Sequence, residues 1–303
     1  MQAQILVAAS LVGTLGLAGC ASAITPPSVP STPSSNVDST ICANGDLPTV
    51  TQGTVTIATD SPAFPPYFDD DDPSNGKGFE SAVAYAVAGK LGYATQDVVW
   101  VAVPFNESYA PGDKNFDFDI NQISITPKRA KNVTFSESYH TVTQAVVARK
   151  DSPVASATTI DELRTARLGA QQGTTSLIFI KKVVRTNTEA TVFKDTSDAI
   201  SALEEEQVGG VVVDLPTAFY LTTVALEDTK IVGQYQTPGE DEGYGLLMAK
   251  GSPLESCVDW AVSELKTSGE LQRLQDQWLA GESAPYFQES GASSASASAS
   301  PSP

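Results

Sequence analysis

Hydrophobic residues after position 50 follow strand and helix periods in turn. Residues 55–59 alternate with the two-residue period of a β-strand, and apolar residues between 79 and 91 recur at the three- and four-residue spacing of a helix. Apolar runs at 98–103 and 116–124 predict two more strands, and the second leads into Thr126-Pro127, a typical helix start. This order of elements indicates an α/β fold.

A second series of the same kind begins after residue 166. In it, three short apolar strands alternate with two predicted helices. The strands are predicted at 167–170, 192–193 and 211–213, and the helices at 176–184 and 197–206. Two such series predict two α/β lobes. A late strand at 246–249 and amphipathic helices at 254–265 and 271–278 follow, and periodicity alone does not assign them to either lobe.

The first twenty residues have the pattern of an export signal. The apolar run 5–18 is shorter than the roughly 20 residues that a membrane span needs, and it is typical of a signal-peptide core. It ends in Leu17-Ala18-Gly19-Cys20, which resembles the bacterial lipobox, whose cysteine becomes the lipidated first residue. We therefore expect residues 1–19 to be removed and Cys20 to anchor the protein at the extracytoplasmic face of the cell membrane. A buried helix is the alternative interpretation of the run.

The two ends of the chain have compositions that cannot build a core. Of the residues 21–40, 13 of 20 are Ser, Thr or Pro, which favours an extended, solvated chain. Residues 290–303 contain only Ser, Gly, Ala and Pro. We expect a tether at 20–48 and a disordered tail at 282–303.

Charge and composition exclude several classes of protein. The 303 residues carry 36 acidic and 18 basic side chains, a net charge of −18, so the chain lacks the excess of basic residues that a nucleic-acid-binding protein needs. One histidine and three cysteines are too few for a His-rich metal site, and we expect no metal and no cofactor. The acidic run 69–72 lacks the spacing of an EF-hand loop, which favours a solvated loop.

Two cysteines remain when Cys20 is assigned to lipid attachment. Exported proteins meet an oxidising compartment, which favours a disulfide between Cys42 and Cys257. The alternative is two unpaired thiols, because the sequence does not show that the two residues are close.

The densest chemical signal lies where predicted strands run into helix starts. Arg129 follows Ser124 and Thr126 at one such start, where backbone N–H groups and an arginine fork both suit a carboxylate. The segment 173–175, Gly-Thr-Thr, occupies the same position in the second series. The alternative readings are a solvated arginine and a plain turn with a helix cap.

A third candidate is Asp214, which ends the apolar strand 211–213. Ligand-binding groups of α/β proteins occur at the carboxyl ends of strands, and a carboxylate there can pair with an ammonium group. The alternative is that Asp214 only caps the helix that Pro216 opens.

These segments together resemble a known family. In order and spacing the chain from about 54 to 280 is similar to the periplasmic amino-acid-binding proteins of ABC importers, the polar amino acid type called solute-binding protein family 3. The segments that carry the resemblance are 60–68, 78–80, 124–129, 172–175, 213–214 and 269–279. It implies a type II periplasmic binding protein fold, in which two α/β lobes joined by two crossovers close on a ligand like a Venus flytrap.

The resemblance also implies domain boundaries. The crossovers would fall near 141–147 and 240–245. Lobe 1 would comprise 49–143 and 244–281, including the two late helices, and lobe 2 would comprise 144–243.

The resemblance further implies a role for each candidate residue. Arg129 would clamp the α-carboxylate of an amino acid, with help from Thr175 and the backbone around Thr174. Asp214 and Ser124 would hold its ammonium group.

The side chain of the ligand would meet different residues. Phe64 would cover it, and Asp60 would contact its polar end. Asn121 and Gln122 stand where the family usually has small residues. The acids Asp60 and Glu80 allow a cationic ligand, whereas the two amides suit glutamine or asparagine equally well.

The expected function is therefore capture of a polar amino acid and its delivery to an ABC permease and ATPase. We expect a monomeric, non-enzymatic, membrane-anchored lipoprotein that binds no nucleic acid. Two alternatives are a cyclohexadienyl-type dehydratase on the same fold and a lipoprotein that signals ligand to a membrane receptor. The single histidine, His140, lies near the first crossover, where we expect a structural role.

Overall fold

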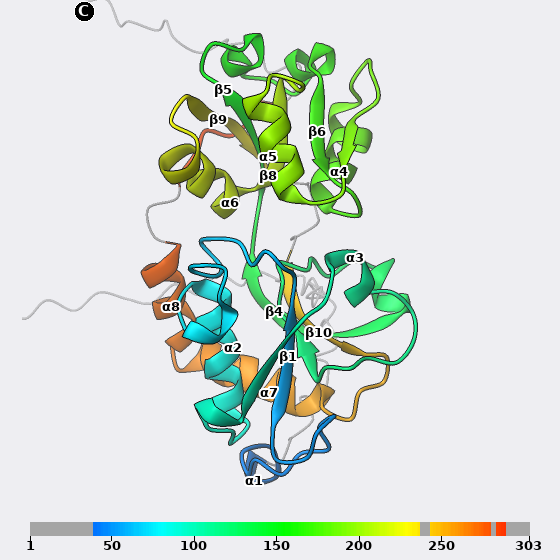
Figure 1. Cartoon of the computed structure of the whole chain (residues 1–303), viewed down its shortest axis with the longest axis vertical. Coiled ribbons are helices and arrows are strands. Elements are labelled where there is room, and N and C mark those ends of the chain that lie inside the picture. The colour runs from blue at the N-terminus through cyan, green and yellow to red at the C-terminus, as the bar shows by residue number, and fades with distance from the viewer. Residues whose placement is uncertain (1–38, 237–242, 280–282, 289–303) are drawn as a thin grey trace, which may run out of the picture. The chain divides into compact units, whose positions relative to one another are not determined.

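The computed structural model describes residues 39–236, 243–279 and 283–288. The expected signal peptide, Cys20, most of the expected tether and residues 289–303 lie outside them. In this described part, no helix combines the length and apolar character needed to cross a bilayer. It contains two five-stranded sheets, each with its own helices (Figure 1). The two-lobed α/β architecture is thus confirmed.

The first sheet is mixed. β1 lies between two parallel neighbours, β2 and β3, while β10 is antiparallel to β3 and β4 on either side. All five residues of β1 are buried, as expected for a central strand covered on both faces. The strand order is β2 (Val98–Ala102), β1 (Val55–Thr59), β3 (Phe118–Asp119), β10 (Gly243–Ala249), β4 (Val133–Thr141).

Helices α2 and α7 each supply several apolar side chains that pack on this sheet. Val83 and Val87 of α2 and Val258 of α7 are fully buried in one cluster with the sheet residues Ile57 and Phe118. The two late helices therefore belong to the first lobe. The helices of this lobe are α1 (Ser39–Cys42), α2 (Phe79–Lys90), α3 (Phe105–Ser108), α7 (Glu255–Thr267) and α8 (Glu270–Trp278).

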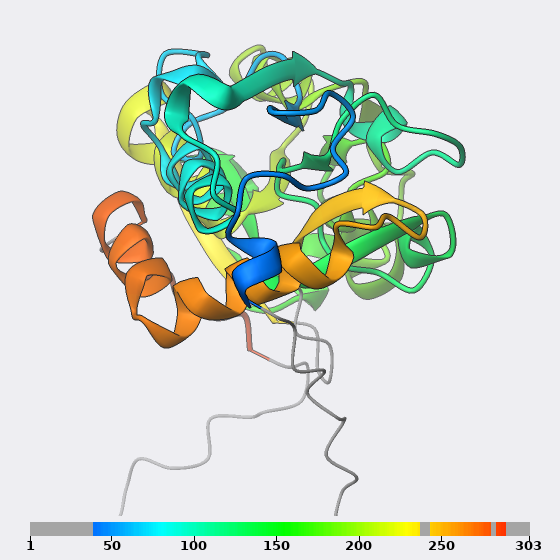
Figure 2. The same ribbon diagram turned by 90° about the horizontal axis from the view of Figure 1, so that it is seen from below.

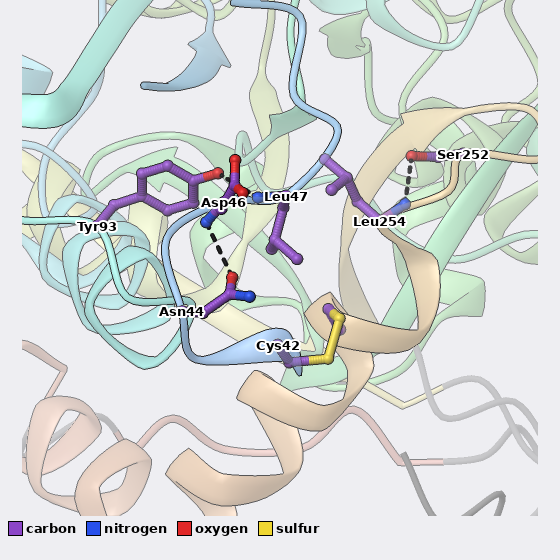
Figure 3. Close-up of a disulfide and its surroundings, with 8 residues drawn as sticks. Cys42, Asn44, Asp46, Leu47, Tyr93, Ser252 and Leu254 are labelled. Atoms are coloured by element: carbon purple, nitrogen blue, oxygen red, sulfur yellow. Dashed lines mark hydrogen bonds between the residues drawn. A yellow bond between two sulfur atoms is a disulfide. The ribbon is translucent and has the colours of Figure 1, made fainter. Parts of the chain in front are cut away.

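The start of the described chain is packed against α7. Figure 2 shows α1 beside α7, and Cys42 forms a disulfide with Cys257 at a Cα–Cα distance of 5.2 Å (Figure 3). Leu47 is 6% exposed, and its backbone N–H donates to the hydroxyl of Tyr93 at 3.3 Å. Residues 39–48, expected as part of the tether, therefore belong to the packed fold, because an apolar side chain and a cross-link fasten them.

The second sheet has its own layer of helices. β5 runs antiparallel to β8 and β9, and β6 runs parallel to β7 and β8. The strand order is β7 (Thr191–Phe193), β6 (Leu168–Gln171), β8 (Gly210–Asp214), β5 (Gln144–Arg149), β9 (Thr229–Tyr235). The helices are α4 (Thr175–Phe179) continued by a π-helical turn Ile180–Val184, α5 (Thr196–Glu204), and α6 (Leu215–Tyr220) continued by Leu221–Ala225.

Two segments of chain connect the sheets. β4 of the first sheet ends at Thr141, and β5 of the second begins at Gln144, so the first crossover is Val142-Thr143. The second crossover lies between β9 and β10, and its residues 237–242 are outside the described part.

Two local predictions in the first lobe were wrong. The strand expected at 116–124 is limited to the two residues of β3. It is this short because β3 pairs with β10 at a single residue pair and the chain turns at Gln122, whose φ is 48°. The helix expected after Thr126-Pro127 is a 3₁₀ turn at Arg129–Lys131, because β4 begins two residues later.

The last described residues lie on the second lobe. Tyr286 forms a parallel bridge with Gln234 of β9, and the N–H of Phe287 donates to the carbonyl of Gln234 at 3.0 Å. Phe287 is 8% exposed and lies over Gly233, where a Cβ atom would be 2.9 Å from its ring. The expectation of a disordered tail from residue 282 is therefore wrong for residues 283–288, because Phe287 has apolar surface to bury.

Candidate ligand-binding site

One pocket brings together all seven predicted ligand-binding residues. The first sheet contributes four of them, and the second contributes three from the carboxyl ends of β6 and β8. They are Asp60, Phe64, Ser124, Arg129, Thr174, Thr175 and Asp214. Because they come from both lobes, the pocket lies between the lobes.

Arg129 is the buried cation of the pocket. It is 5% exposed, and its guanidinium lies 4.7 Å from the ring centroid of Tyr109 and 5.2 Å from that of Phe105. Nη1 donates to the carbonyl of Ser124 at 2.8 Å, and Nη2 donates to the carbonyl of Gly173 at 2.9 Å. The alternative reading of Arg129 as a solvated arginine is therefore wrong. These contacts fix the plane of a fork that suits a carboxylate.

The hydroxyl residues at the pocket divide into two groups. Ser124 Oγ of the first lobe lies 3.4 Å from Thr175 Oγ1 of the second, so these two hydroxyls meet across the pocket. Thr174, in contrast, uses its hydroxyl to cap α4, because Oγ1 accepts the N–H of Leu177 at 3.1 Å. Only the backbone of Thr174 is left to face a ligand.

Asp214 lies at the N-cap position of α6 but does not cap it. Its Oδ1 accepts from Gln144 Nε2 at 2.7 Å, and its Oδ2 accepts from the hydroxyl of Tyr244 at 2.5 Å. Gln144 Oε1 in turn accepts from Ser176 at 2.6 Å, which orients the amide. The carboxylate of Asp214 is thus held by one donor from each lobe and faces the pocket.

The segment 60–64 lines another part of the pocket. Asp60 accepts from the N–H of Ser61 at 2.8 Å and from that of Phe105 at 3.2 Å. Burial raises the pKa of Asp60, Asp195 raises it further, and Lys194 lowers it. Phe64 lines the same pocket, between cis peptide bonds at Ser61-Pro62 and Pro65-Pro66.

Sequence reasoning missed several lining residues, of which Asp195 is the most informative. It precedes α5 and caps that helix through the N–H of Asp198, at 2.9 Å. The sequence signal was the same strand-to-helix junction that singled out Gly173-Thr174-Thr175. Gln144, which does not line the pocket but donates to Asp214, was also missed, because a glutamine at the start of a strand carries no functional pattern.

Two buried carboxyl groups, those of Glu80 and Asp119, lie behind the floor of the pocket, which is the segment Asn121-Gln122. Glu80 and Asp119 are both fully buried, and burial raises the pKa of each: that of Glu80 to about 7, and that of Asp119 well above its usual range. Neither oxygen of Asp119 has a hydrogen-bond partner. Burial thus shifts Asp119 toward its neutral acid form.

His140 and the acidic run 69–72 make contacts that support the fold and not the pocket. His140 packs edge-on against Phe79, with ring centroids 5.2 Å apart, and burial lowers its pKa to about 4. It is neutral at physiological pH and does not line the pocket. In the acidic run 69–72, Asp71 accepts from the N–H of Ala63 and Asp72 from that of Ser74, so both shape local turns.

Two α/β lobes with a polar pocket between them form the type II periplasmic binding protein fold. The chain belongs to the bacterial extracellular solute-binding proteins, family 3, which match residues 55–281.

Known relatives agree with this assignment. The chain is 24% identical over 209 residues to an arginine-binding extracellular protein of Bacillus subtilis (strain 168), covering 68% of this chain and 78% of that protein. It is 25% identical over 224 residues to an arginine-binding periplasmic protein of Mannheimia haemolytica, covering 73% and 89%. It is 23% identical over 231 residues to an L-cystine-binding protein of Escherichia coli (strain K12), covering 75% and 83%.

Solved structures share the fold. An ancestral arginine-binding protein bound to arginine superposes with a TM-score of 0.64 at 30% identity, covering 75% of this chain and 98% of that one. An ancestral arginine-binding protein bound to glutamine superposes with a TM-score of 0.65 at 29% identity, covering 76% of this chain and 99% of that one. The Bacillus and Mannheimia relatives are named as an extracellular and a periplasmic binding protein.

Proposed function

We propose that this protein captures an amino acid with a cationic side chain and delivers it to the permease and ATPase subunits of an ABC importer. The observation that carries the proposal is the charge of the pocket. Three carboxylates, Asp60, Asp195 and Asp214, line it together with one cation, Arg129. The relatives named for arginine, cystine, glutamine and histidine support an amino acid as ligand.

The α-carboxylate and α-ammonium groups of an amino acid would each pair with one charged residue of the pocket. Its carboxylate would pair with Arg129 and its ammonium group with Asp214. Burying either group without a partner would cost several kcal/mol. Because the two partners are supplied by different lobes, a bound ligand would stabilise the closed arrangement over an open one.

After that pairing, Asp60 and Asp195 are the two pocket carboxylates left to face the side chain of the ligand. They come from different lobes, and the charge of Asp195 adds to the effect of burial in raising the pKa of Asp60. A guanidinium or ammonium group between them would relieve this repulsion. A neutral amide would leave it in place. The pocket therefore favours arginine, lysine or ornithine over glutamine.

The cellular setting of the proposal rests on the sequence. The lipobox at residues 17–20 supports a lipid anchor on Cys20, and the composition of residues 21–38 supports a tether between anchor and fold. We propose a monomer that binds its ligand without converting it. A relative in structure is described as a precursor of cyclohexadienyl dehydratase, at 24% identity, which makes the dehydratase an outcome that the experiment must be able to detect.

A ligand screen by thermal melting tests this function. Residues 39–288 would be melted with each of the twenty amino acids, ornithine, citrulline and prephenate. A ligand at a hundredfold its dissociation constant adds about 2.7 kcal/mol to the stability of the fold. We expect arginine or another cationic amino acid to raise the melting temperature, and Asp214→Asn to abolish the rise. No shift with any amino acid would refute the proposal, and conversion of prephenate would favour the dehydratase.

The choice of cationic ligands should depend on Asp195. We expect Asp195→Asn to weaken arginine binding about tenfold and glutamine binding less than threefold, because it removes one of the two carboxylates that face the side chain. Asparagine still caps α5, so the melting temperature should change little. Isothermal titration calorimetry with both ligands measures the effect. Glu204→Gln, which removes the same charge at the other end of α5, is the control and should leave both affinities unchanged.

Gly173 should be required for the lobes to approach each other. Its φ is 77°, and a Cβ atom there would overlap the side-chain ends of Asn106 and Tyr109 of the first lobe, which would have to move aside. We expect Gly173→Ala to weaken ligand binding by up to about tenfold, because moving these side chains disturbs the contact between the lobes. Gly251→Ala is the matched control, since Gly251 has a φ of 71° and nothing within 4 Å of the added atom. If both variants bound as the unaltered protein does, Gly173 would have no part in closure.

A further inference from the structure

Glu80, in the first turn of α2, lies behind the pocket floor and is 0% exposed. Its carboxylate accepts three hydrogen bonds. The backbone N–H of Gln122 donates to Oε1 at 2.8 Å. The hydroxyl of Tyr139 also donates to Oε1, and the side-chain amide of Gln122 donates to Oε2. Two of the three bonds thus come from one residue, and that residue lines the ligand pocket.

Gln122 has an unusual backbone. Its φ of 48° is in the left-handed region, which non-glycine residues rarely adopt because of steric strain. The neighbouring residues Asn121 and Ser124 line the pocket as well. The bond from its backbone N–H to Glu80 helps hold this conformation. Glu80 therefore determines where the pocket floor lies.

The same contact determines which end of the Gln122 amide faces Glu80. An ionised carboxylate can only accept hydrogen bonds, so it selects the NH₂ end of the amide. The carbonyl oxygen Oε1 is then the group that Gln122 can offer to a ligand. A protonated Glu80 can donate a hydrogen bond. To accept it, the Gln122 amide must turn its carbonyl oxygen toward Glu80 and its NH₂ group toward the pocket.

We propose that Glu80 is a positioning residue whose ionised form turns the carbonyl oxygen of Gln122 toward the ligand, so that capture of a cationic amino acid depends on the surrounding pH. The inference rests on the function proposed above for the same pocket and adds a specificity-determining residue to it. Glu80 does not line the pocket, and it acts through Gln122.

The surroundings of Glu80 place its titration near neutrality. Burial is the largest influence and raises its pKa to about 7, although the bonds from Tyr139 and Gln122 lower it and the charge of Asp214 raises it. Of the neighbours that titrate, Asp119 is shifted toward its acid form by burial, and His140 on β4 is neutral near pH 7 because burial lowers its pKa to about 4. The groups that face Glu80 or its partners are Tyr139 and His140 of β4, Asp119 of β3, Asp214 of β8, Tyr67, and Tyr244 of β10.

The sign of the pH effect follows from linkage. A cationic ligand beside Asp214 offsets the charge that raises the pKa of Glu80, and it prefers the carbonyl end of Gln122. Binding therefore favours the ionised carboxylate and lowers its pKa, so a proton is released. Affinity should be greatest above pH 7 and should fall as the pH drops below 7.

Calorimetric titration with arginine at about pH 7.5 and about pH 5.5 tests the inference, because the guanidinium and carboxylate of arginine keep their charges over that range and its α-ammonium group stays mostly protonated. We expect about tenfold weaker binding at the lower pH. Titrations near pH 7 in two buffers of different ionisation enthalpy should show proton release. Glu80→Gln should bind arginine as weakly at pH 7.5 as the unaltered protein does at pH 5.5, and it should release no proton.

Two further variants separate positioning from general damage to the fold. Tyr139→Phe removes one donor to the carboxylate, so the midpoint of the pH dependence should move upward while the dependence itself remains. Asp117→Asn alters another buried carboxylate, which accepts from the N–H groups of Val50 and Thr56 at 2.7 Å and does not line the pocket. It should lower the melting temperature and leave the pH dependence and proton release unchanged.

Each outcome has a distinct meaning. Arginine binding with equal affinity at both pH values would overturn this inference alone, and so would a Glu80→Gln variant that folds and keeps the pH dependence. Failure of the unaltered protein to bind any amino acid would overturn the proposed function, and this inference with it.

Discussion

Replacing Arg129 with alanine should weaken amino-acid binding at least a hundredfold, which corresponds to about 3 kcal/mol. The guanidinium is buried against two aromatic rings and donates to carbonyl oxygens from both lobes. Without it, the ligand carboxylate would be buried with no cationic partner, and truncation of one member of such a pair typically costs about 2–5 kcal/mol. Titration calorimetry with the best ligand from the thermal screen measures the loss.

Two substitutions serve as comparisons for this experiment. Arg129→Lys keeps the charge but loses the planar fork and its stacking on Tyr109, so it should bind with intermediate affinity. Lys128→Ala removes the neighbouring charge, which does not line the pocket, and should have little effect. An Arg129→Ala variant that binds with unchanged affinity would exclude Arg129 from the binding site.

Loss of the disulfide should have the largest effect on stability. Cys42 and Cys257 are 215 residues apart in sequence, so their bond closes a long loop and restricts the unfolded chain. We expect Cys42→Ser to reduce the free energy of unfolding by about 2–5 kcal/mol. The melting temperature should fall by about 5–15 °C, since each kcal/mol shifts a fold of this size by about 2–4 °C. Scanning calorimetry of both proteins under oxidising conditions gives the comparison.

Reductant provides the control for that measurement. With the bond reduced, the unaltered protein should melt close to the Cys42→Ser variant. The variant itself should be insensitive to reductant. If Cys42→Ser caused an equal drop with and without reductant, the loss would come from packing around the buried Cys42 and not from the cross-link.

The sequence predicted the elements whose hydrophobic pattern is set locally. β1 and α2 were found from their periods, and Asp214 was found because it ends an apolar strand. The shortness of β3 could not be predicted. It depends on pairing with β10, which lies more than a hundred residues further along the chain.

The candidate site was predicted to a similar extent. Arg129 was found because it follows a predicted strand-to-helix junction and Asp214 because it ends an apolar strand, and the resemblance to a family gave them roles. Asp195 was missed because a helix cap and a pocket carboxylate have the same sequence pattern. Gln144 and Glu80 were not assigned their contacts, because a polar side chain acquires its partners only when distant strands are brought together.

Residues 39–48 and 283–288 show a related effect at the borders of the fold. Both lie next to stretches rich in Ser, Thr, Pro or Ala, so average composition placed them in flexible segments. A single buried side chain in each, Leu47 or Phe287, has enough apolar surface to hold a short segment in place. Composition averaged over twenty residues hides such single anchors.

The docking of Phe287 also determines what a label at this end of the chain would report. The preceding helices α7 and α8 belong to the first lobe, whereas Tyr286 and Phe287 lie along β9 of the second. A fluorophore at Gln288 would therefore follow the lobe that carries Asp214. Paired with a second fluorophore on the exposed side of α2, it would turn the separation of the lobes into an optical signal for the bound ligand.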